Sequence, residues 1–418
     1  MNALTKSEAQ GLADSVPLSE IDLSDTSLYQ NDSVWPYLAR LRRDDPIHYK
    51  EGGIQGNFWS VTRYKDIVAV DTNHQVFSSE SSLGGITIVD APTQMRRPSF
   101  ISMDPPKHDE QRKAVSPIVA PGNLSKLEAT IRSRAIAILD SLPIGETFDW
   151  VDKVSIELTT QMLATLFDFP FEDRRLLTYW SDTATTTPQD GNAEAWAKRD
   201  AILQECLAYF TRLWNQRVNA DPGTDLISML AHAPATRDMT PQAFLGNLVL
   251  LIVGGNDTTR NSISGGLLFM NQNPDQFAKL RANRELIPSA VSEIIRYQTP
   301  LSHMRRTALT DTELGGKQIR KGDKVVMWYL SGNRDDAVIE NPDAFIVDRP
   351  RARQHLSFGF GIHRCVGNRL AEMQLQILWE EALKRFPTIE VVGEPQRVAS
   401  CFVHGFSSMP VRIPSRAA

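Results

Sequence analysis

Residues 358–371 read Phe-Gly-Phe-Gly-Ile-His-Arg-Cys-Val-Gly-Asn-Arg-Leu-Ala and place one cysteine between a glycine-rich loop and a helix-like run over residues 368–386. A thiolate at Cys365 would face its ligand from a helix N-terminus, where backbone N–H groups and the helix dipole favour negative charge. The glycines of this stretch allow the backbone to approach a large, flat group without side-chain clash. The stretch therefore predicts a thiolate that meets a large planar ligand.

Cys365 has two simpler explanations. A lone cysteine is usually a small buried hydrophobic residue, and we interpret Cys206 and Cys401 in that way. A His-x-Cys pair such as His363 and Cys365 can also form half of a zinc site, but the sequence contains no second Cys/His cluster that would complete four ligands. Neither explanation accounts for the spaced glycine and aromatic residues around Cys365.

The spacing within residues 358–371 is specific. The pattern Phe-x-x-Gly-x-His-x-Cys-x-Gly, followed by Leu-Ala, resembles the haem-binding loop of the cytochrome P-450 monooxygenases. The resemblance implies a mainly α fold with a minor β region, the cytochrome P-450 fold. It also implies a thiolate-ligated haem b (iron protoporphyrin IX), with Cys365 as the axial ligand of the iron and with Phe358 and Gly359 in contact with the haem.

The composition is that of a globular protein. The chain has 418 residues, of which 41% are hydrophobic and 23% are charged. It contains no linker-like segment and no internal repeat, so we expect a single domain over residues 1–418, with residues 1–30 loosely ordered. The net charge of −5 argues against nucleic acid as a partner, which requires a basic surplus or a basic stripe.

The chain also has features of a cytoplasmic protein. Its three cysteines lack the even spacing of a disulfide framework. The first eight residues are polar and contain no apolar signal-peptide core. The longest apolar run, Leu248–Val253, is far shorter than a membrane span. We therefore expect a soluble, cytoplasmic protein without a membrane anchor.

Hydrophobic periodicity predicts an α-rich chain. Residues 125–300 are dominated by helical spacing, and residues 242–271 fit one long helix that is apolar nearly all round. A further helix is expected to begin near Lys107, after the Asp-Pro-Pro break. The expected strands are a hairpin at residues 46–50 and 58–62, and the segments 313–319, 324–330 and 400–413.

The middle of the long helix contains a local conflict. Residues 254–259 read Gly-Gly-Asn-Asp-Thr-Thr, and each glycine costs a helix interior about 1 kcal/mol relative to alanine. A close helix crossing would explain the glycines alone, but a conflict of this kind also indicates function. The string resembles the oxygen-binding groove of the cytochrome P-450 family. By that resemblance Gly254 opens the helix above the haem, Thr258 hydrogen-bonds bound oxygen or an ordered water, and Asp257 relays protons.

Glu293 and Arg296 are three positions apart in the sequence, which makes them neighbours on a helix. Alone, such a pair is an ordinary surface ion pair that contributes little stability. The cytochrome P-450 family has Glu-x-x-Arg here, completed by an arginine from a later segment that matches residues 342–349. The resemblance therefore implies a structural triad of Glu293, Arg296 and Arg349 that supports the cysteine loop.

Haem carries two propionates, which need cationic or hydrogen-bonding partners. His108 and Arg112 lie four residues apart on one face of the helix expected after Lys107, and they match a propionate-contacting stretch of the family. Arg306 and His363 match two further propionate partners. Arg305 stands directly before Arg306, so either arginine could occupy that position.

Apolar residues occupy the positions at which the family contacts its substrates. Each could belong to the core alone, but together they predict a narrow apolar pocket. They are Leu83, Ile86, Ile88, Leu250, Leu301, Met304, Phe402 and Val403. The runs at residues 254–262, 301–307 and 355–371 look like the bacterial alkane-hydroxylase branch.

The resemblance implies a monooxygenase that inserts one oxygen atom from O₂ into an unactivated C–H bond. The expected substrate is a medium-chain alkane or fatty acid, hydroxylated at its terminal carbon. The alternatives are another small apolar substrate such as a terpene, a peroxide-driven haem-thiolate enzyme, and a non-catalytic haem sensor. The Asp-Thr pair argues against the peroxide-driven enzyme, and no signalling domain is visible for a sensor.

No segment of the chain can hold a flavin or an iron–sulfur centre. Electrons from NAD(P)H are therefore expected to arrive through separate proteins, a 2Fe–2S ferredoxin and a ferredoxin reductase. Four arginines near the cysteine could attract an acidic ferredoxin, although a charge run is often only a solvated face. They are Arg351, Arg353, Arg364 and Arg369.

Overall fold

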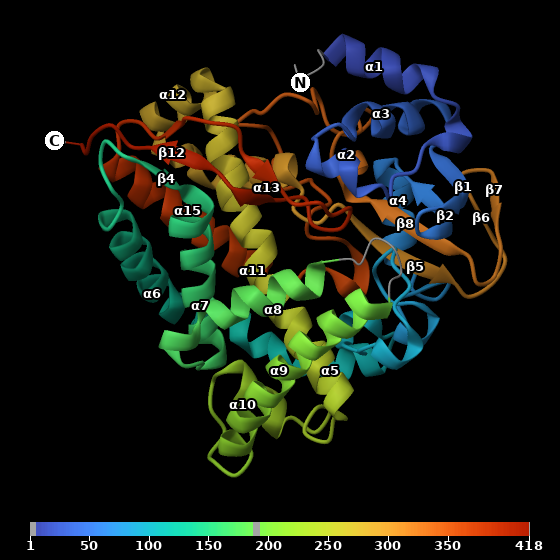
Figure 1. Ribbon diagram of the computed structural model, residues 1–418, viewed down its shortest axis with the longest axis horizontal. Coiled ribbons are helices and arrows are strands. Elements are labelled where there is room, and N and C mark those ends of the chain that lie inside the picture. The colour runs from blue at the N-terminus through green and yellow to red at the C-terminus, as the bar shows by residue number, and fades with distance from the viewer. Residues whose placement is uncertain (1–5, 187–192, 418) are drawn as a thin grey trace.

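The computed structural model describes residues 6–186 and 193–417 (Figure 1). Its α-helices are α1 (Lys6–Ser15), α2 (Thr26–Gln30), α3 (Trp35–Asp44), α4 (Tyr64–Thr72), α5 (Lys107–Val115), α6 (Pro121–Asp140), α7 (Glu157–Phe167), α8 (Arg175–Thr185), α9 (Ala193–Arg217), α10 (Leu226–His232), α11 (Pro241–Gln272), α12 (Pro274–Ala282), α13 (Ile287–Gln298), α14 (Tyr329–Gly332) and α15 (Asn368–Arg385). Helices dominate the structure, which confirms the mainly α class.

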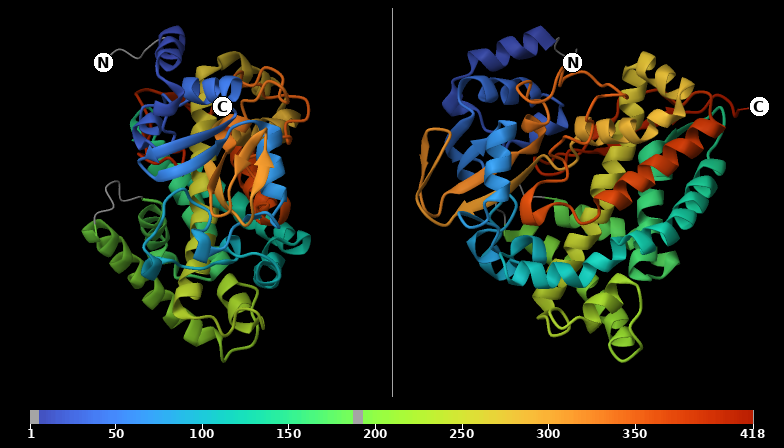
Figure 2. Two further views of the ribbon diagram at one scale, coloured as in Figure 1. Left: turned by 90° about the vertical axis from the view of Figure 1, so that its right-hand side faces the viewer. Right: turned by 180° about the vertical axis from the view of Figure 1, so that it is seen from behind.

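The strands form small sheets. They are β1 (Ile47–Gly53), β2 (Gly56–Val61), β3 (Phe77–Ser78), β4 (Thr147–Asp149), β5 (His303–Ala308), β6 (Thr312–Leu314), β7 (Lys317–Ile319), β8 (Lys324–Trp328), β9 (Glu390–Val391), β10 (Gln396–Arg397), β11 (Phe406–Ser408) and β12 (Pro410–Arg412). The largest sheet has the order β1-β2-β8-β5-β3. Its strands gather at one side of the molecule with the N-terminal helices, and the other helices surround α11 (Figures 1 and 2).

Helix α11 is the centre of the helical part. It begins where the Thr240 side chain accepts a hydrogen bond from the Ala243 N–H, with Pro241 in its first turn. Most of its residues are buried, and it packs against α7, α8, α13 and α15. The single long helix expected at residues 242–271 is therefore confirmed. Such a helix needs apolar neighbours on all sides because it exposes no broad polar face.

The predicted hairpin is also confirmed, since β1 pairs antiparallel with β2 and Ile47 lies opposite Val61. Three other strand expectations need correction. The segment 313–319 forms two short strands, β6 and β7, which pair antiparallel across a turn. The strand expected at 324–330 ends at Trp328, because the next residues form α14. Of the segment 400–413, the first residues form a turn, and strands occupy only 406–408 and 410–412.

The N-terminal segment contains helices in its described part. Residues 6–30 contain α1 and α2, and Ile21, Leu23 and Tyr29 are buried in a cluster with Trp328 of β8. Residues 1–5 lie outside the described part of the chain. In the described part, no helix combines the length and the apolar character required to cross a membrane.

Candidate functional site

The loop before α15, which carries Cys365, crosses the end of α4. Gly359 and Gly361 both have φ of 65°, a left-handed conformation that favours glycine. A Cβ atom at Gly361 would also lie only 2.5 Å from the Asp71 carbonyl oxygen. The Cys365 N–H donates a 2.8 Å hydrogen bond to the Phe358 carbonyl, which closes the loop. Glycine is therefore required where the loop crosses the end of α4.

The Cys365 side chain borders an internal cavity. The side chain is exposed where it faces this cavity, inside the protein. Burial raises the pKa of the thiol, while the Gly367 N–H and the nearby arginines Arg112 and Arg364 oppose that rise. A bound metal cation would shift the balance fully to the thiolate.

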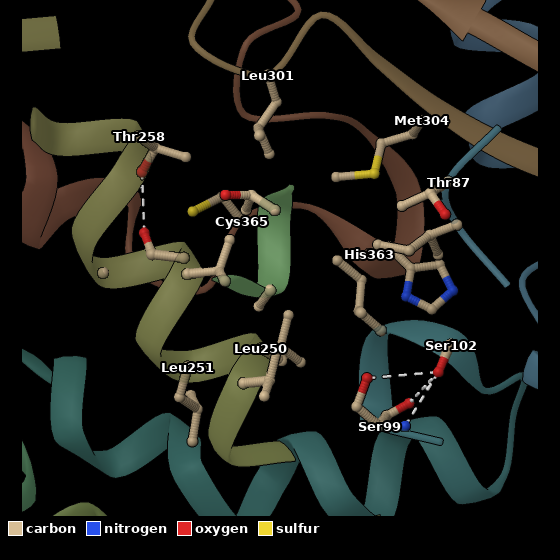
Figure 3. Close-up of a pocket in the computed structure, with 18 of the residues that line it drawn as sticks. Thr87, Ser99, Ser102, Leu250, Leu251, Thr258, Leu301, Met304, His363 and Cys365 are labelled. Atoms are coloured by element: carbon tan, nitrogen blue, oxygen red, sulfur yellow. Dashed lines mark hydrogen bonds between the residues drawn. The ribbon is translucent and has the colours of Figure 1, made fainter. Parts of the chain in front are cut away.

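The cavity has a volume of about 440 Å³ and mostly apolar walls. Figure 3 shows Leu250 and Thr258 of α11 on one side of it, and Met304 and His363 on the other. Side chains from α11, β5, the loop 84–102 and the C-terminal turn therefore meet over Cys365. Segments distant in the sequence build one chamber.

The two glycines of α11 have different surroundings. A Cβ atom at Gly254 would meet nothing within 4 Å, because this position faces the cavity. A Cβ atom at Gly255 would lie 2.7 Å from a methyl carbon of Leu163 on α7. Gly255 thus permits the close helix crossing and Gly254 leaves room beside the cavity. The Thr258 hydroxyl lines the cavity and donates a 2.9 Å hydrogen bond to the Gly254 carbonyl (Figure 3).

Asp257 lies outside the cavity lining and is completely buried. It accepts hydrogen bonds from the Ser181 hydroxyl at 2.8 Å and from Arg260 Nη2 at 2.5 Å. Burial raises the pKa of the Asp257 carboxyl, and Arg260 counteracts that rise. Arg260 Nη2 also donates to Asp182 at 2.9 Å, and the Asp182 side chain is 53% exposed. A chain of polar groups therefore joins Asp257 to the surface.

A cluster of nitrogen-bearing side chains lies at the other end of the cavity. The rings of His108 and His363 are 4.4 Å apart. Nε2 of His108 and both ring nitrogens of His363 are buried without a hydrogen-bond partner among the described residues. Burial lowers the pKa of His363 to about 2. Arg112 and Arg306 line the cavity here, so the cluster combines positive charge with unsatisfied donors or acceptors.

Arg305 and Arg306 have separate surroundings. Arg306 lines the cavity and donates to Asp71 at 2.7 Å. Arg305 points away from the cavity and donates to Asp90 at 2.5 Å and to the Leu83 carbonyl at 3.1 Å. The alternation of side chains along β5 thus selects Arg306, rather than Arg305, as the arginine beside the cavity.

Most of the expected substrate-contacting residues line the cavity. These are Ile86, Ile88, Leu250, Leu301, Met304 and Phe402. Two positions differ from the expectation. Leu83 is 41% exposed and does not line the cavity, because Arg305 and Thr307 hold its carbonyl and its side chain faces outward. Val403 is buried behind the wall, where it forms a β-bridge with Leu301.

Glu293, Arg296 and Arg349 form one buried cluster. Arg296 Nε and Arg349 Nε donate to the same Glu293 oxygen at 2.7 and 2.8 Å. Arg296 also donates to the Asn333 carbonyl at 2.8 Å, and the Asn333 side chain binds the Leu356 N–H at 2.7 Å, just before the cysteine loop. The pair is therefore no surface ion pair, and its hydrogen bonds lead to the cysteine loop.

Comparisons with known proteins agree with this geometry. The family model described as Cytochrome P-450 matches residues 129–404. Linalool 8-monooxygenase of Pseudomonas putida is 37% identical over 93% of this chain and 98% of its own length. The chain belongs to the cytochrome P-450 family. It is a cytochrome P-450 monooxygenase, and the expected fold is confirmed by solved structures.

Two solved cytochrome P-450 structures are especially similar. Cytochrome P-450-153 from Novosphingobium aromaticivorans has a TM-score of 0.89 and 49% identity, over 94% of this chain and 99% of that chain. CYP153D17 from Sphingomonas sp. PAMC 26605 has a TM-score of 0.89 and 50% identity, over 94% of this chain and 98% of that chain. The similarity therefore extends over nearly the whole molecule.

The residues of this cytochrome P-450 fit a thiolate-bound haem. The Cys365 thiol borders the chamber, and Gly254 leaves open space on its helix wall. His363, Arg112 and Arg306 line the cavity, and His108 packs against His363 without lining it; their unsatisfied ring nitrogens and positive charges are suited to two carboxylates. An unpaired buried polar atom destabilises a protein, so these nitrogens are expected to gain a partner when haem binds.

Sequence reasoning missed several residues of the site. Asp71 accepts hydrogen bonds from Arg306, Tyr329 and the Phe360 N–H, and so it connects β5 to the cysteine loop. Trp196 of α9 and Phe100 of the loop 84–102 also line the cavity. No local motif marks these positions, because each becomes part of the site only through long-range contacts.

Proposed function

We propose that this cytochrome P-450 hydroxylates the terminal carbon of a medium-chain alkane or fatty acid. The observation that carries the proposal is the apolar wall over Cys365, to which Leu250, Leu301 and Phe402 contribute from separate segments. Apolar walls recognise a hydrocarbon chain by excluding water from it. The sequence runs that resemble the bacterial alkane-hydroxylase branch support the same substrate class.

Haem bound through Cys365 supplies the activation of O₂ and the transfer of one oxygen atom. The chain's own residues decide which carbon reacts. A methyl C–H bond is stronger than a methylene C–H bond, so terminal selectivity must come from geometry. We propose that Leu250, Leu301, Met304 and Phe402 hold the end of the hydrocarbon chain nearest to Cys365, and that Ile86 forms a further part of the wall.

Proton delivery is proposed for Thr258 and Asp257. The Thr258 hydroxyl donates to the Gly254 carbonyl, so its lone pairs are available to a water molecule in the cavity. The hydrogen bonds among Asp257, Arg260 and the half-exposed Asp182 support a route from solvent toward the same part of α11. His108, Arg112, Arg306 and His363 would hold the propionates, beside loop residues Phe358 and Gly359.

We expect replacement of Thr258 by alanine to divert reducing equivalents to hydrogen peroxide. The variant loses the hydroxyl that positions a proton donor, and such groups contribute on the order of 10²–10⁴ in rate. Haem content should be unchanged, because Thr258 is not among its proposed ligands. The measurement is the ratio of product to peroxide per NADH consumed, and Thr258→Ser is the matched control. An alanine variant that still converts nearly all consumed NADH into hydroxylated product would exclude a role of Thr258 in proton delivery.

Reduction by a 2Fe–2S ferredoxin and its reductase, with electrons from NAD(P)H, is proposed for the electron supply. Arg351, Arg364 and Arg369 are exposed around the cysteine loop. Arg353 is exposed as well, although it pairs with Glu372 at 2.6 Å. The three cysteines form no disulfide, which is consistent with a reducing cytoplasm.

Charge reversal at Arg369 is expected to slow reduction by an acidic ferredoxin roughly 10-fold at low ionic strength, because steering by opposite charge raises association rates. Added salt should reduce the difference by screening. The exposed Arg237, in the loop after α10, is the control for the same charge change. Stopped-flow reduction measures both variants, and equal rates would remove the docking proposal.

A terpene is the second candidate substrate. The 37% identical relative is named for oxidation of linalool, a branched terpene alcohol. A substrate-induced spin-shift titration distinguishes the candidates by comparing linear alkanes, fatty acids, terpenes and steroids under one set of conditions. A linear alkane or fatty acid is expected to induce the spin shift with the lowest dissociation constant. A spin shift restricted to terpenes or steroids would contradict it.

A further inference from the structure

Strand β5 has two functional faces. Met304 and Arg306 line the cavity. His303 and Arg305 alternate with them and therefore face the other side, where they contact the loop at residues 83–90. The backbone N–H of Arg305 also donates a 2.8 Å hydrogen bond to the Ile86 carbonyl. One face of β5 thus lines the cavity directly, and the other face holds the loop at residues 83–90, which forms another part of the cavity wall.

His303 connects two wall segments that are far apart in the sequence. Its Nε2 accepts a 3.2 Å hydrogen bond from the Ile88 N–H, and its Nδ1 donates a 2.9 Å hydrogen bond to the Cys401 carbonyl. Ile88 lines the cavity, and so does Phe402, the residue after Cys401. Both hydrogen bonds are made to backbone atoms, so they fix the backbone position of each segment.

The His303 ring is buried and neutral. It has no exposed surface, and its centroid lies 4.9 Å from that of Trp328 and 5.3 Å from that of Phe402. Burial lowers its pKa to about 4. The two partners require one donor and one acceptor, which the neutral ring with hydrogen on Nδ1 provides.

We infer that His303 is a specificity-determining positioning residue that sets the spacing between the Ile88 wall and the Phe402 wall. The inference rests on the proposed function, in which these walls orient a hydrocarbon chain. The joined segments lie outside the regular sheets. Besides the Leu301–Val403 bridge, the Ser302 N–H donates to the Phe402 carbonyl and Lys324 Nζ donates to the Ile88 carbonyl, so a few individual hydrogen bonds decide where the segments lie. His303 does not touch the reacting atoms and acts through the residues that it holds. A wider gap between the two walls would let the hydrocarbon chain of the substrate slide. A methylene next to the terminal methyl would then reach the reaction centre.

The test compares His303→Leu with His303→Gln in the haem-loaded enzyme. Leucine keeps an apolar side chain but neither hydrogen bond, whereas glutamine retains a donor and an acceptor. Ser302→Ala is the matched control, because the buried Ser302 hydroxyl has no partner among the described residues. Two readouts are used: hydrogen–deuterium exchange of the peptide containing Ile88, and the ratio of terminal to subterminal alcohol from a linear substrate.

In His303→Leu, exchange at Ile88 should be roughly 10-fold faster, as expected for one lost buried hydrogen bond. The terminal-to-subterminal ratio should fall by roughly 3- to 10-fold. The glutamine and Ser302→Ala enzymes should resemble the wild type in both readouts. If the leucine variant does not bind haem, His303→Phe, whose ring fills the site but makes neither hydrogen bond, takes its place with the same expectations.

Unchanged exchange and an unchanged product ratio in the variant that lacks the hydrogen bonds would overturn the inference. Faster exchange with an unchanged ratio would also overturn it, since His303 would then be structural only. Failure of the proposed function can be distinguished from failure of this inference. In the first case the wild-type enzyme would hydroxylate no linear substrate, whereas the exchange data would still show whether His303 holds the two walls.

Discussion

Replacement of Cys365 by histidine is expected to abolish monooxygenase activity and the thiolate-type spectrum of the ferrous–CO complex. The Cys365 thiol borders the chamber at the end of a glycine-rich loop, and its backbone is held by the Phe358 carbonyl. Histidine can bind iron, so haem can remain in the variant, but a neutral imidazole lacks the electron donation of a thiolate. The measurement is the absorbance spectrum of the reduced, CO-saturated protein together with turnover.

Cys206→Ala is the control for the loss of a cysteine. Cys206 lies buried on α9 and borders no part of the cavity. Its variant should retain the thiolate-type spectrum, apart from a modest loss of stability caused by the smaller side chain. Retention of that spectrum in Cys365→His would disprove the assignment of the ligand.

The second large effect is expected from Glu293→Ala. The substitution leaves Arg296 and Arg349 buried without their shared carboxylate, and breaking such a cluster typically costs about 3–5 kcal/mol. The loss should reach the cysteine loop, because Arg296 holds the Asn333 carbonyl and Asn333 binds the Leu356 N–H. We expect a large decrease in the free energy of unfolding, measured by denaturant titration, and loss of haem.

Glu390→Ala is the matched control. Glu390 pairs with Arg412 at 2.8 Å, but both side chains are partly exposed. Its removal should cost less than about 1 kcal/mol, because exposed ion pairs contribute little. Equal costs for the two variants would show that the buried cluster has no special structural role.

The features that the sequence predicted well have local signatures. The loop around Cys365 and the glycines at residues 254–255 violate ordinary propensities, so they are visible without a structure. Helix α11 was predictable because its apolar character extends over many turns.

The missed features depend on contacts between distant segments. Leu83 was expected in the pocket, but its direction depends on Arg305 and Thr307, which lie more than two hundred residues later. Asp71 and His303 resemble ordinary buried polar residues in the sequence. Their roles emerge only where β5, the loops and the cysteine segment meet. Loop backbones have no periodicity from which side-chain direction can be predicted.

Product analysis with a linear medium-chain alkane is the most direct test of terminal hydroxylation. Purified enzyme, a ferredoxin, a ferredoxin reductase and NADH are incubated with octane under ¹⁸O₂, and the alcohols are identified by mass spectrometry. The primary alcohol is expected as the main product, with one labelled oxygen atom. Mainly subterminal alcohols, or no hydroxylation of a chain that does bind, would contradict a cavity that holds the chain end beside Cys365.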